Sequence, residues 1–369
     1  MPEAEIRTWL HDTLVPVQAQ QPRRVYEIGC GTGMLLFALA GGCSEYWASD
    51  PAGGAIAYVR QHLAQAQLAP EQVRLLVRPA DDFSDIPQGY FDTLIINSVV
   101  HYFPTADYLL HVLRQAFKAL APGGMVLVGD VRNMHLLRAF HTSVQLFQAA
   151  PDLPIHQLRH RVQTQLLNEE QLTIDPAFFA ALHHTDPQIA RVEIRLKRSP
   201  YPTEHTRFRY NALLYKAADP ATGPAVDTGV HWRHWQEDEL TIDGLRAWLT
   251  QEQPRAAGVT DIFNARVLTD AIAVNLLLRP PHTPTTTAEL RRQISGTNQR
   301  GIDPDRLRDM GESLGYTVQV GWSPNDAACF DVLFTRPDST PPPLPIADPQ
   351  RANRSGSGRA MPTIRSNRY

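Results

Sequence analysis

The chain has 369 residues, of which 43% are hydrophobic and 20% are charged, and its formal net charge is -3. This composition predicts a globular protein with room for one large domain and a smaller one, and it gives no general attraction to nucleic acid or to an anionic membrane. The three cysteines lack paired spacing and the first residues lack an export signal, so we expect no disulfides, no metal, no membrane anchor and a cytoplasmic location.

Residues 25–33 join a buried strand to a glycine-rich turn, and an apolar helix follows at 34–39. Glycine at alternate positions lets the backbone turn sharply and pass close to a ligand. A dinucleotide fingerprint needs its third glycine five residues after the first, where this chain has Met34. Glu27 would repel a pyrophosphate and would suit a cationic amino-acid group. The turn resembles the S-adenosylmethionine (SAM) loop of class I methyltransferases, with expected contacts from Glu27, Gly29, Cys30, Gly31, Thr32 and Gly33.

Short apolar strands then alternate with helices, which predicts a mostly parallel sheet covered by helices. We expect strands at 25–28, 46–50, 73–78, 91–97 and 125–130, with an antiparallel pair at 191–197 and 207–216 that closes the sheet. The expected fold is therefore the α/β, Rossmann-like fold of class I methyltransferases.

The remaining segments predict three additions to this sheet. Residues 130–190 are expected to form a helical lid over the carboxyl ends of the strands, where open α/β sheets bind ligands. Residues 1–219 would be the methyltransferase domain and 220–336 a small α+β subdomain, helical around Trp232 to Leu249 and helix, strand, loop, strand over 302–334. Residues 337–369 would be a Pro-rich linker and a basic disordered tail.

Polar side chains follow several of the expected strands. Asp50 stands where a carboxylate can accept hydrogen bonds from both ribose hydroxyls. After the third strand, Asp81 or Asp82 would bind the adenine amino group, with Asp81 preferred, and Phe83 would lie against the ring. Asn97 leaves the fourth strand, beside the place of methyl transfer.

The transfer itself is an in-line displacement on carbon, so the enzyme chiefly aligns a neutral nucleophile and excludes water. An amine must first lose a proton, and histidine has a suitable ordinary pKa for that task. We expect His101, Asp130 and His141 to act in catalysis. The expected substrate contacts are Tyr102, Arg132 and Arg207.

Several collinear blocks resemble the N-methyltransferase domains embedded in nonribosomal peptide synthetases. They are residues 25–33, 80–84, 91–93 with 97–104, 129–132, 140–146, 174–179, 206–210, 264–267, and 301–304 with 314–316. The resemblance covers about residues 10–336 and departs from the family at 51–54, where an aromatic residue and a serine are more frequent. It implies methyl transfer from SAM, with release of S-adenosylhomocysteine, to the α-amine of an aminoacyl group tethered to a carrier protein.

Several alternatives stay open at this point. No adenylation, condensation or carrier signature flanks the resemblance, so the chain either acts alone on a free or carrier-bound amino acid or is a fragment of a larger synthetase. The same fold could methylate oxygen or carbon of a related small molecule, or serve as a degenerate SAM-binding scaffold. A nicotinamide oxidoreductase is disfavoured by Glu27 and Met34.

Overall fold

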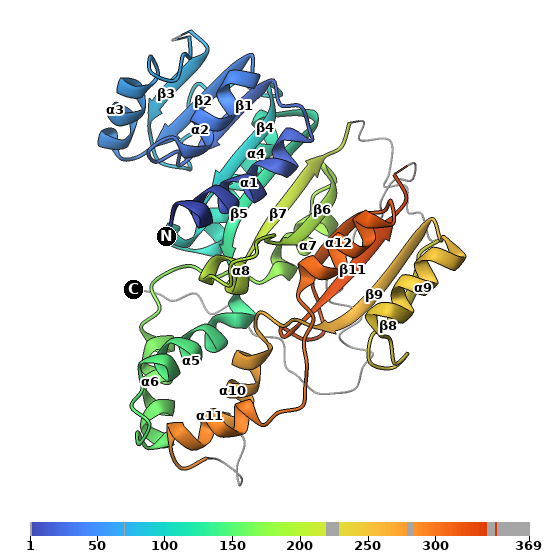
Figure 1. Ribbon diagram of the computed structural model, residues 1–369. Coiled ribbons are helices and arrows are strands. Elements are labelled where there is room, and N and C mark those ends of the chain that lie inside the picture. The colour runs from blue at the N-terminus through green and yellow to red at the C-terminus, as the bar shows by residue number, and fades with distance from the viewer. Residues whose placement is uncertain (1, 70, 219–228, 279–283, 338–343, 345–369) are drawn as a thin grey trace.

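The computed structural model describes residues 2–69, 71–218, 229–278, 284–337 and 344. Its main sheet has seven strands in the order β3-β2-β1-β4-β5-β7-β6 (Figure 1). They are β1 (Arg24–Ile28), β2 (Glu45–Asp50), β3 (Val73–Val77), β4 (Phe91–Asn97), β5 (Leu120–Arg132), β6 (Ile189–Leu196) and β7 (Arg209–Lys216). Strands β1 to β5 are parallel, and β7 is antiparallel to β5 and β6. The predicted parallel sheet with its closing antiparallel pair is confirmed. Apart from residues 337 and 344, the predicted linker and tail lie outside the described residues.

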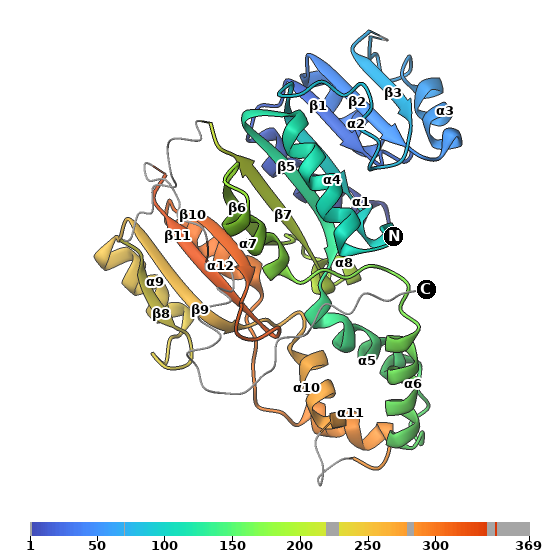
Figure 2. The same ribbon diagram turned by 180° about the vertical axis from the view of Figure 1, so that it is seen from behind.

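Helices cover both faces of this sheet, as the two opposite views show (Figures 1 and 2). One face carries α1 (Glu3–Gln18), α2 (Met34–Leu39) and α3 (Gly53–His62), and the other carries α4 (Ala106–Ala119) and α7 (Pro176–Thr185). Side chains alternate along a strand, so Val25 joins the core under α1 to α3 and Tyr26 joins the core under α4. Thr105 begins α4 by accepting a hydrogen bond from the Tyr108 N–H at 3.1 Å.

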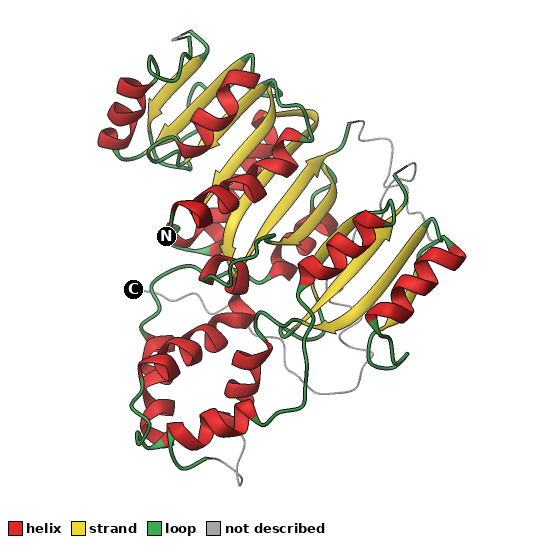
Figure 3. Cartoon of the chain, in the orientation of Figure 1, coloured by secondary structure: helices red, strands yellow, loops and turns green. Residues whose placement is uncertain are grey.

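Four helices pack together beyond the carboxyl end of β5 (Figure 3). They are α5 (Leu137–Gln148), α6 (Ile155–Leu167), α10 (Leu268–Leu278) and α11 (Thr287–Ser295), joined through a small core of Ile155, Leu158, Leu277 and Leu290. We call them the four-helix group. The predicted lid at 130–190 differs in one respect, because α7 packs on the sheet through the fully buried Phe179. The division of the chain at residue 219 stays a prediction, although α10 and α11 pack with helices from before it.

A second sheet has four strands in the order β10-β11-β9-β8. They are β8 (His231–His234), β9 (Ala256–Phe263), β10 (Thr317–Trp322) and β11 (Cys329–Thr335), and α9 (Ile242–Glu252) and α12 (Pro304–Ser313) lie on one face (Figure 3). The predicted order over 302–334 is confirmed. The predicted helical position of Trp232 is wrong: it pairs with Gly258 in a strand, and its ring lies where a Cβ on Gly258 would be 2.2 Å away.

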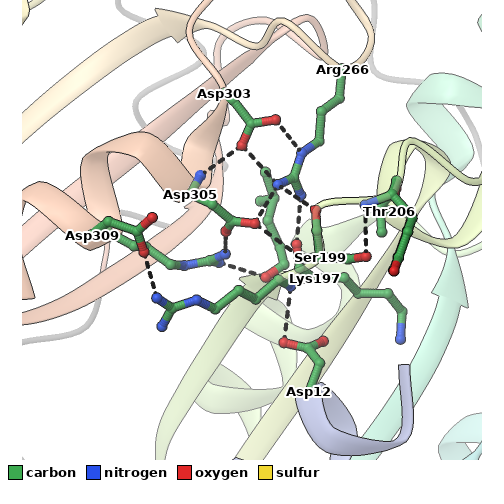
Figure 4. A network of polar contacts seen from close by, with 12 residues as sticks. Asp12, Lys197, Ser199, Thr206, Arg266, Asp303, Asp305 and Asp309 are labelled. Carbon is green, nitrogen blue, oxygen red and sulfur yellow. Dashed lines mark hydrogen bonds and ion pairs between the residues drawn. The ribbon is translucent and has the colours of Figure 1, made fainter. Parts of the chain in front are cut away.

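A network of ion pairs and hydrogen bonds joins the two sheets (Figure 4). The guanidinium of Arg266 lies 2.8 Å from an Asp303 oxygen and 2.6 Å from an Asp305 oxygen. From α1, Asp12 accepts a hydrogen bond from the Arg198 N–H at 2.9 Å. Segments from the start, middle and end of the described chain therefore meet at one place. The short helix α8 (Glu204–Phe208) lies beside this network.

Candidate active site

The glycine turn after β1 takes a backbone path that side chains rarely allow. Gly29, Gly31 and Gly33 have φ of +77°, +53° and +81°. A Cβ on Gly29 would lie 2.4 Å from the Val99 side chain, whereas a Cβ on Gly31 would meet no heavy atom within 4 Å. The turn is thus packed at Gly29 and open at Gly31, where its backbone can approach a ligand. Of the other two predicted contacts in this turn, Cys30 is buried and Thr32 is exposed.

Asp50, at the end of β2, ties the glycine turn to the segment that precedes α3. One of its oxygens accepts the Gly31 N–H at 2.9 Å and the other accepts the Ala52 N–H at 2.8 Å. A carboxylate has about four acceptor positions, so both oxygens can accept further hydrogen bonds. These residues fit the ribose contact predicted for Asp50.

Glu27 is a buried acid beneath the turn, with 3% of its surface exposed. The Tyr46 hydroxyl donates a hydrogen bond to it at 2.7 Å. Burial raises the pKa of Glu27 to about 7, and the negative charge of Asp50 adds a small increase. The hydrogen bond from Tyr46 lowers this pKa but does not outweigh burial. A cation placed nearby would stabilise the carboxylate, which fits the cationic amino-acid part of SAM.

The two candidate acids after β3 have different surroundings. Asp81 is exposed and accepts a hydrogen bond from the Tyr108 hydroxyl at 2.8 Å, while Asp82 accepts the Ser84 N–H of its own turn at 2.9 Å. Phe83 is half-buried, with its ring 6.0 Å from that of Tyr26. Each of the two acids therefore already accepts one hydrogen bond, and the preference for Asp81 as the adenine contact stays a prediction.

Two buried polar groups beyond β4 lack partners. Neither Oδ1 of Asn97 nor Nδ1 of His101 has a hydrogen-bond partner among the described residues. Burial, reinforced by the charge of Arg209, lowers the pKa of His101 to about 4. His101 is therefore neutral at ordinary pH and a weak proton acceptor. Tyr102, beside it, is 74% exposed.

Asp130, at the end of β5, is fully buried among cations and has a positive φ of +62°. Its oxygens lie 3.2 Å from Nζ of Lys197, 3.0 Å from Nδ1 of His205 and 2.8 Å from a nitrogen of Arg209. Burial would raise the pKa of Asp130, but Lys197, His205 and Arg209 outweigh it and hold this pKa well below its usual range. The Ser98 hydroxyl adds a hydrogen bond at 3.1 Å.

Sequence reasoning missed these three partners of Asp130. His205 and Arg209 lie 75 and 79 residues further along the chain. The available signal was that basic residues stand at both ends of the turn between the two strands predicted to close the sheet.

A second polar group lies between β5 and the four-helix group. Arg132 and His141 share the carboxylate of Glu169, at 2.9 Å and 3.0 Å. Glu169, which sequence reasoning also missed, therefore orients both predicted site residues. Arg207 is ion-paired with Asp270 of α10, so the structure does not bring its charge to Asp130. The substrate contacts of Arg132 and Arg207 and the catalytic role of His141 stay predictions.

The sequence also predicted no metal and no membrane anchor. Across the described ranges, no three His, Cys, Asp or Glu side chains are grouped so that they could hold a metal ion. In the same part of the chain, no helix combines the length and apolar character needed to cross a bilayer.

Comparison with known proteins shows similarity to a methyltransferase domain and to peptide synthetases. Residues 26–126 match the family described as "Methyltransferase domain". Chondramide synthase of Chondromyces crocatus is 37% identical over 92% of this chain, and a probable non-canonical nonribosomal peptide synthetase of Salinispora arenicola is 31% identical over 92%. The matched segments are 9% and 4% of those proteins, so the chain spans less than a tenth of either relative.

Solved structures show weaker similarity. The N-methyltransferase NodS from Bradyrhizobium japonicum, in complex with S-adenosylhomocysteine, is 15% identical over 58% of this chain and 87% of that chain, with a TM-score of 0.38. Magnesium protoporphyrin IX methyltransferase from Synechocystis, with bound SAM, is 12% identical over 58% and 77%, with a TM-score of 0.36. Residues 26–126 thus match a methyltransferase domain, which lies in a seven-stranded sheet of the order described above, and over 92% of its length the chain is similar to segments of nonribosomal peptide synthetases.

Proposed function

We propose that this chain transfers the methyl group of SAM to the α-amine of an amino acid, free or tethered as an aminoacyl group to a carrier protein, in the assembly of a peptide natural product. The observation that carries the proposal is the similarity to peptide synthetases over 92% of the chain, which extends beyond the matched methyltransferase domain into both sheets and the four-helix group. A methyltransferase with an unrelated substrate would share the matched domain but would have no reason to share these additions.

The residues around the glycine turn would hold the cofactor. Asp50 would accept hydrogen bonds from the ribose, Asp81 would accept one from the adenine amino group, and the open backbone at Gly31 would lie against the ligand. Glu27 would stabilise the cationic amino-acid part from beneath the turn. Bound SAM supplies an electrophilic methyl group on a sulfonium.

The residues beyond β4 and β5 would prepare the nucleophile. A substrate α-amine has an ordinary pKa of about 8, so roughly nine-tenths of it is protonated at pH 7 and unable to attack. The site must therefore accept one proton before the nitrogen lone pair can form its bond to carbon. Asp130 and the groups around it lie at this edge of the sheet, while the four-helix group can exclude water from it.

The test begins with calorimetric titration of S-adenosylhomocysteine into the protein. Mass spectrometry then follows SAM incubated with free amino acids, with their N-acetylcysteamine thioesters and with matched hydroxy-acid thioesters. N-methyl products from the amines support the proposal, and the preferred form shows whether a thioester is required. Methylation of the hydroxy acids alone would establish O-methylation instead. If S-adenosylhomocysteine did not bind, the degenerate scaffold would be favoured over an enzyme.

A further inference from the structure

His205 is a histidine at the candidate site to which the predictions gave no role. It lies in α8, and its Nδ1 is 3.0 Å and 3.2 Å from the two oxygens of Asp130. Its side chain keeps 24% of its surface exposed. Within the part of the chain that the structure describes, no hydrogen bond involves its Nε2. One ring nitrogen is thus fixed by a buried carboxylate, and the other is available to a ligand.

The surroundings of Asp130 determine the form of this histidine. Asp130 is held as a carboxylate by Lys197 and Arg209, so it can only accept a hydrogen bond from Nδ1. Nδ1 must then carry the proton, which leaves the lone pair of a neutral imidazole on Nε2.

Other charged groups also face His205 from the elements packed around it. Glu204 of the same helix binds Arg209 at 2.6 Å. A small cavity beside His205 is also lined by Glu5 and Asp12 of α1 and by Lys197 and Arg198. Of these groups, Asp130 is the one that forms a hydrogen bond with the ring of His205.

His101 is less suited to accept a proton. It is 7% exposed, and its pKa is lowered to about 4 by burial and by Arg209. A group that weak would rarely take a proton from an ammonium with an ordinary pKa of about 8. His205 has a paired carboxylate where His101 has an unpartnered nitrogen.

We propose that His205 is the general base of this enzyme, oriented by Asp130; this inference rests on the function proposed above. Nε2 of His205 takes one proton from the substrate ammonium and becomes imidazolium. The nitrogen lone pair then forms the N–C bond while the C–S bond breaks, and its electron pair stays on sulfur, which becomes neutral. The methylated product leaves as an ammonium, and His205 returns its proton to solvent.

The variant His205→Gln tests this role, because glutamine can still donate a hydrogen bond to Asp130 but cannot take up the proton. Turnover at pH 7 should fall at least about tenfold, since only roughly a tenth of an amine of pKa about 8 is neutral at that pH. The deficit should shrink as the pH approaches 9, where solvent deprotonates the amine. Imidazole added to His205→Gly should restore part of the activity.

The matched control is His234→Gln in the second sheet. His234 forms a similar pair with Asp261, at 3.1 Å and with 31% of its side chain exposed, and it belongs to no part of the candidate site. This variant should keep the turnover of the unaltered protein. Binding of S-adenosylhomocysteine by both variants, measured by calorimetry, reports whether the fold is intact, and His205→Asn replaces His205→Gln if the latter does not bind.

The outcomes separate this inference from the proposed function. N-methyl product from the unaltered protein together with full activity of His205→Gln at pH 7 would refute the base and leave the function standing. A loss that is equal at every pH and resists imidazole would also refute it, since a merely structural role predicts that pattern. Absence of N-methyl product from the unaltered protein refutes the function and this inference with it.

Discussion

Glu27→Gln should make the protein more stable at alkaline pH. The pKa of Glu27 rises from an ordinary 4.5 to about 7 in the folded protein. A raised pKa of an acid means that the associated stability is present below the unfolded pKa and is lost as the pH rises through the folded one. This rise in the pKa of Glu27 corresponds to about 3 kcal/mol in total, most of which develops between pH 5 and pH 8.5.

Urea unfolding of the two proteins at pH 5, 6, 7 and 8.5 measures this difference. Glutamine keeps an oxygen for the Tyr46 hydroxyl, and any fixed effect of the substitution cancels when the stability difference is compared between pH values. The control is Glu3→Gln, the same chemical change at a side chain with 78% of its surface exposed. If the difference in free energy of unfolding between Glu27→Gln and the unaltered protein did not change with pH, the argument that ionisation of Glu27 destabilises the fold would be refuted.

Further predictions concern the cofactor turn and the junction between the sheets. Asp50→Ala should weaken binding of S-adenosylhomocysteine about 10- to 100-fold in calorimetry, because charge-assisted hydrogen bonds contribute about 1.5 to 3 kcal/mol each. Unchanged affinity would show that another residue binds the ribose. Gly29→Ala should lower the free energy of unfolding by about 1 to 3 kcal/mol, because its Cβ would meet Val99 at 2.4 Å and its φ is positive. Gly31→Ala should bind the cofactor more weakly, but its free energy of unfolding should fall less than that of Gly29→Ala. A larger fall for Gly31→Ala than for Gly29→Ala would contradict the geometry. Arg266→Met should lower the free energy of unfolding by about 1 to 3 kcal/mol, since the hydrogen bonds of the buried Arg266 to Asp303, Asp305 and the Lys197 carbonyl are lost. An unchanged urea midpoint would show that this network is dispensable.

Local sequence was sufficient to predict the main sheet. Its strands are short apolar runs, and the glycine turn and Asp50 lie at strand ends that alternation alone identifies. Trp232 was misplaced because it stands near apolar residues at helical spacing, and the partner that makes it a strand residue, Gly258, lies beyond the next helix. Propensity carries no information on such a pairing.

Of the candidate site, sequence reasoning located mainly the residues that stand at the ends of strands. His205 and Glu169 contact partners far along the chain and nothing in their own neighbourhoods marks them, whereas Lys197 is one of the basic residues that flank the turn between the closing strands. The position of α7 was also not predictable from local sequence, because Phe179 packs against Tyr210 of β7, which lies further along the chain.

The packing of α10 and α11 against α5 and α6 limits how this protein can be cut and transplanted. A cloning boundary at residue 126 would sever β5 and omit β7, which pairs with it on one side, together with β6. One at residue 219 would leave the small core of the four-helix group half empty and would expose the edge of β6 that β10 covers. Transfer of this methyltransferase to another peptide synthetase should therefore include all of residues 2–337, because the main sheet, the second sheet and the four-helix group pack against one another.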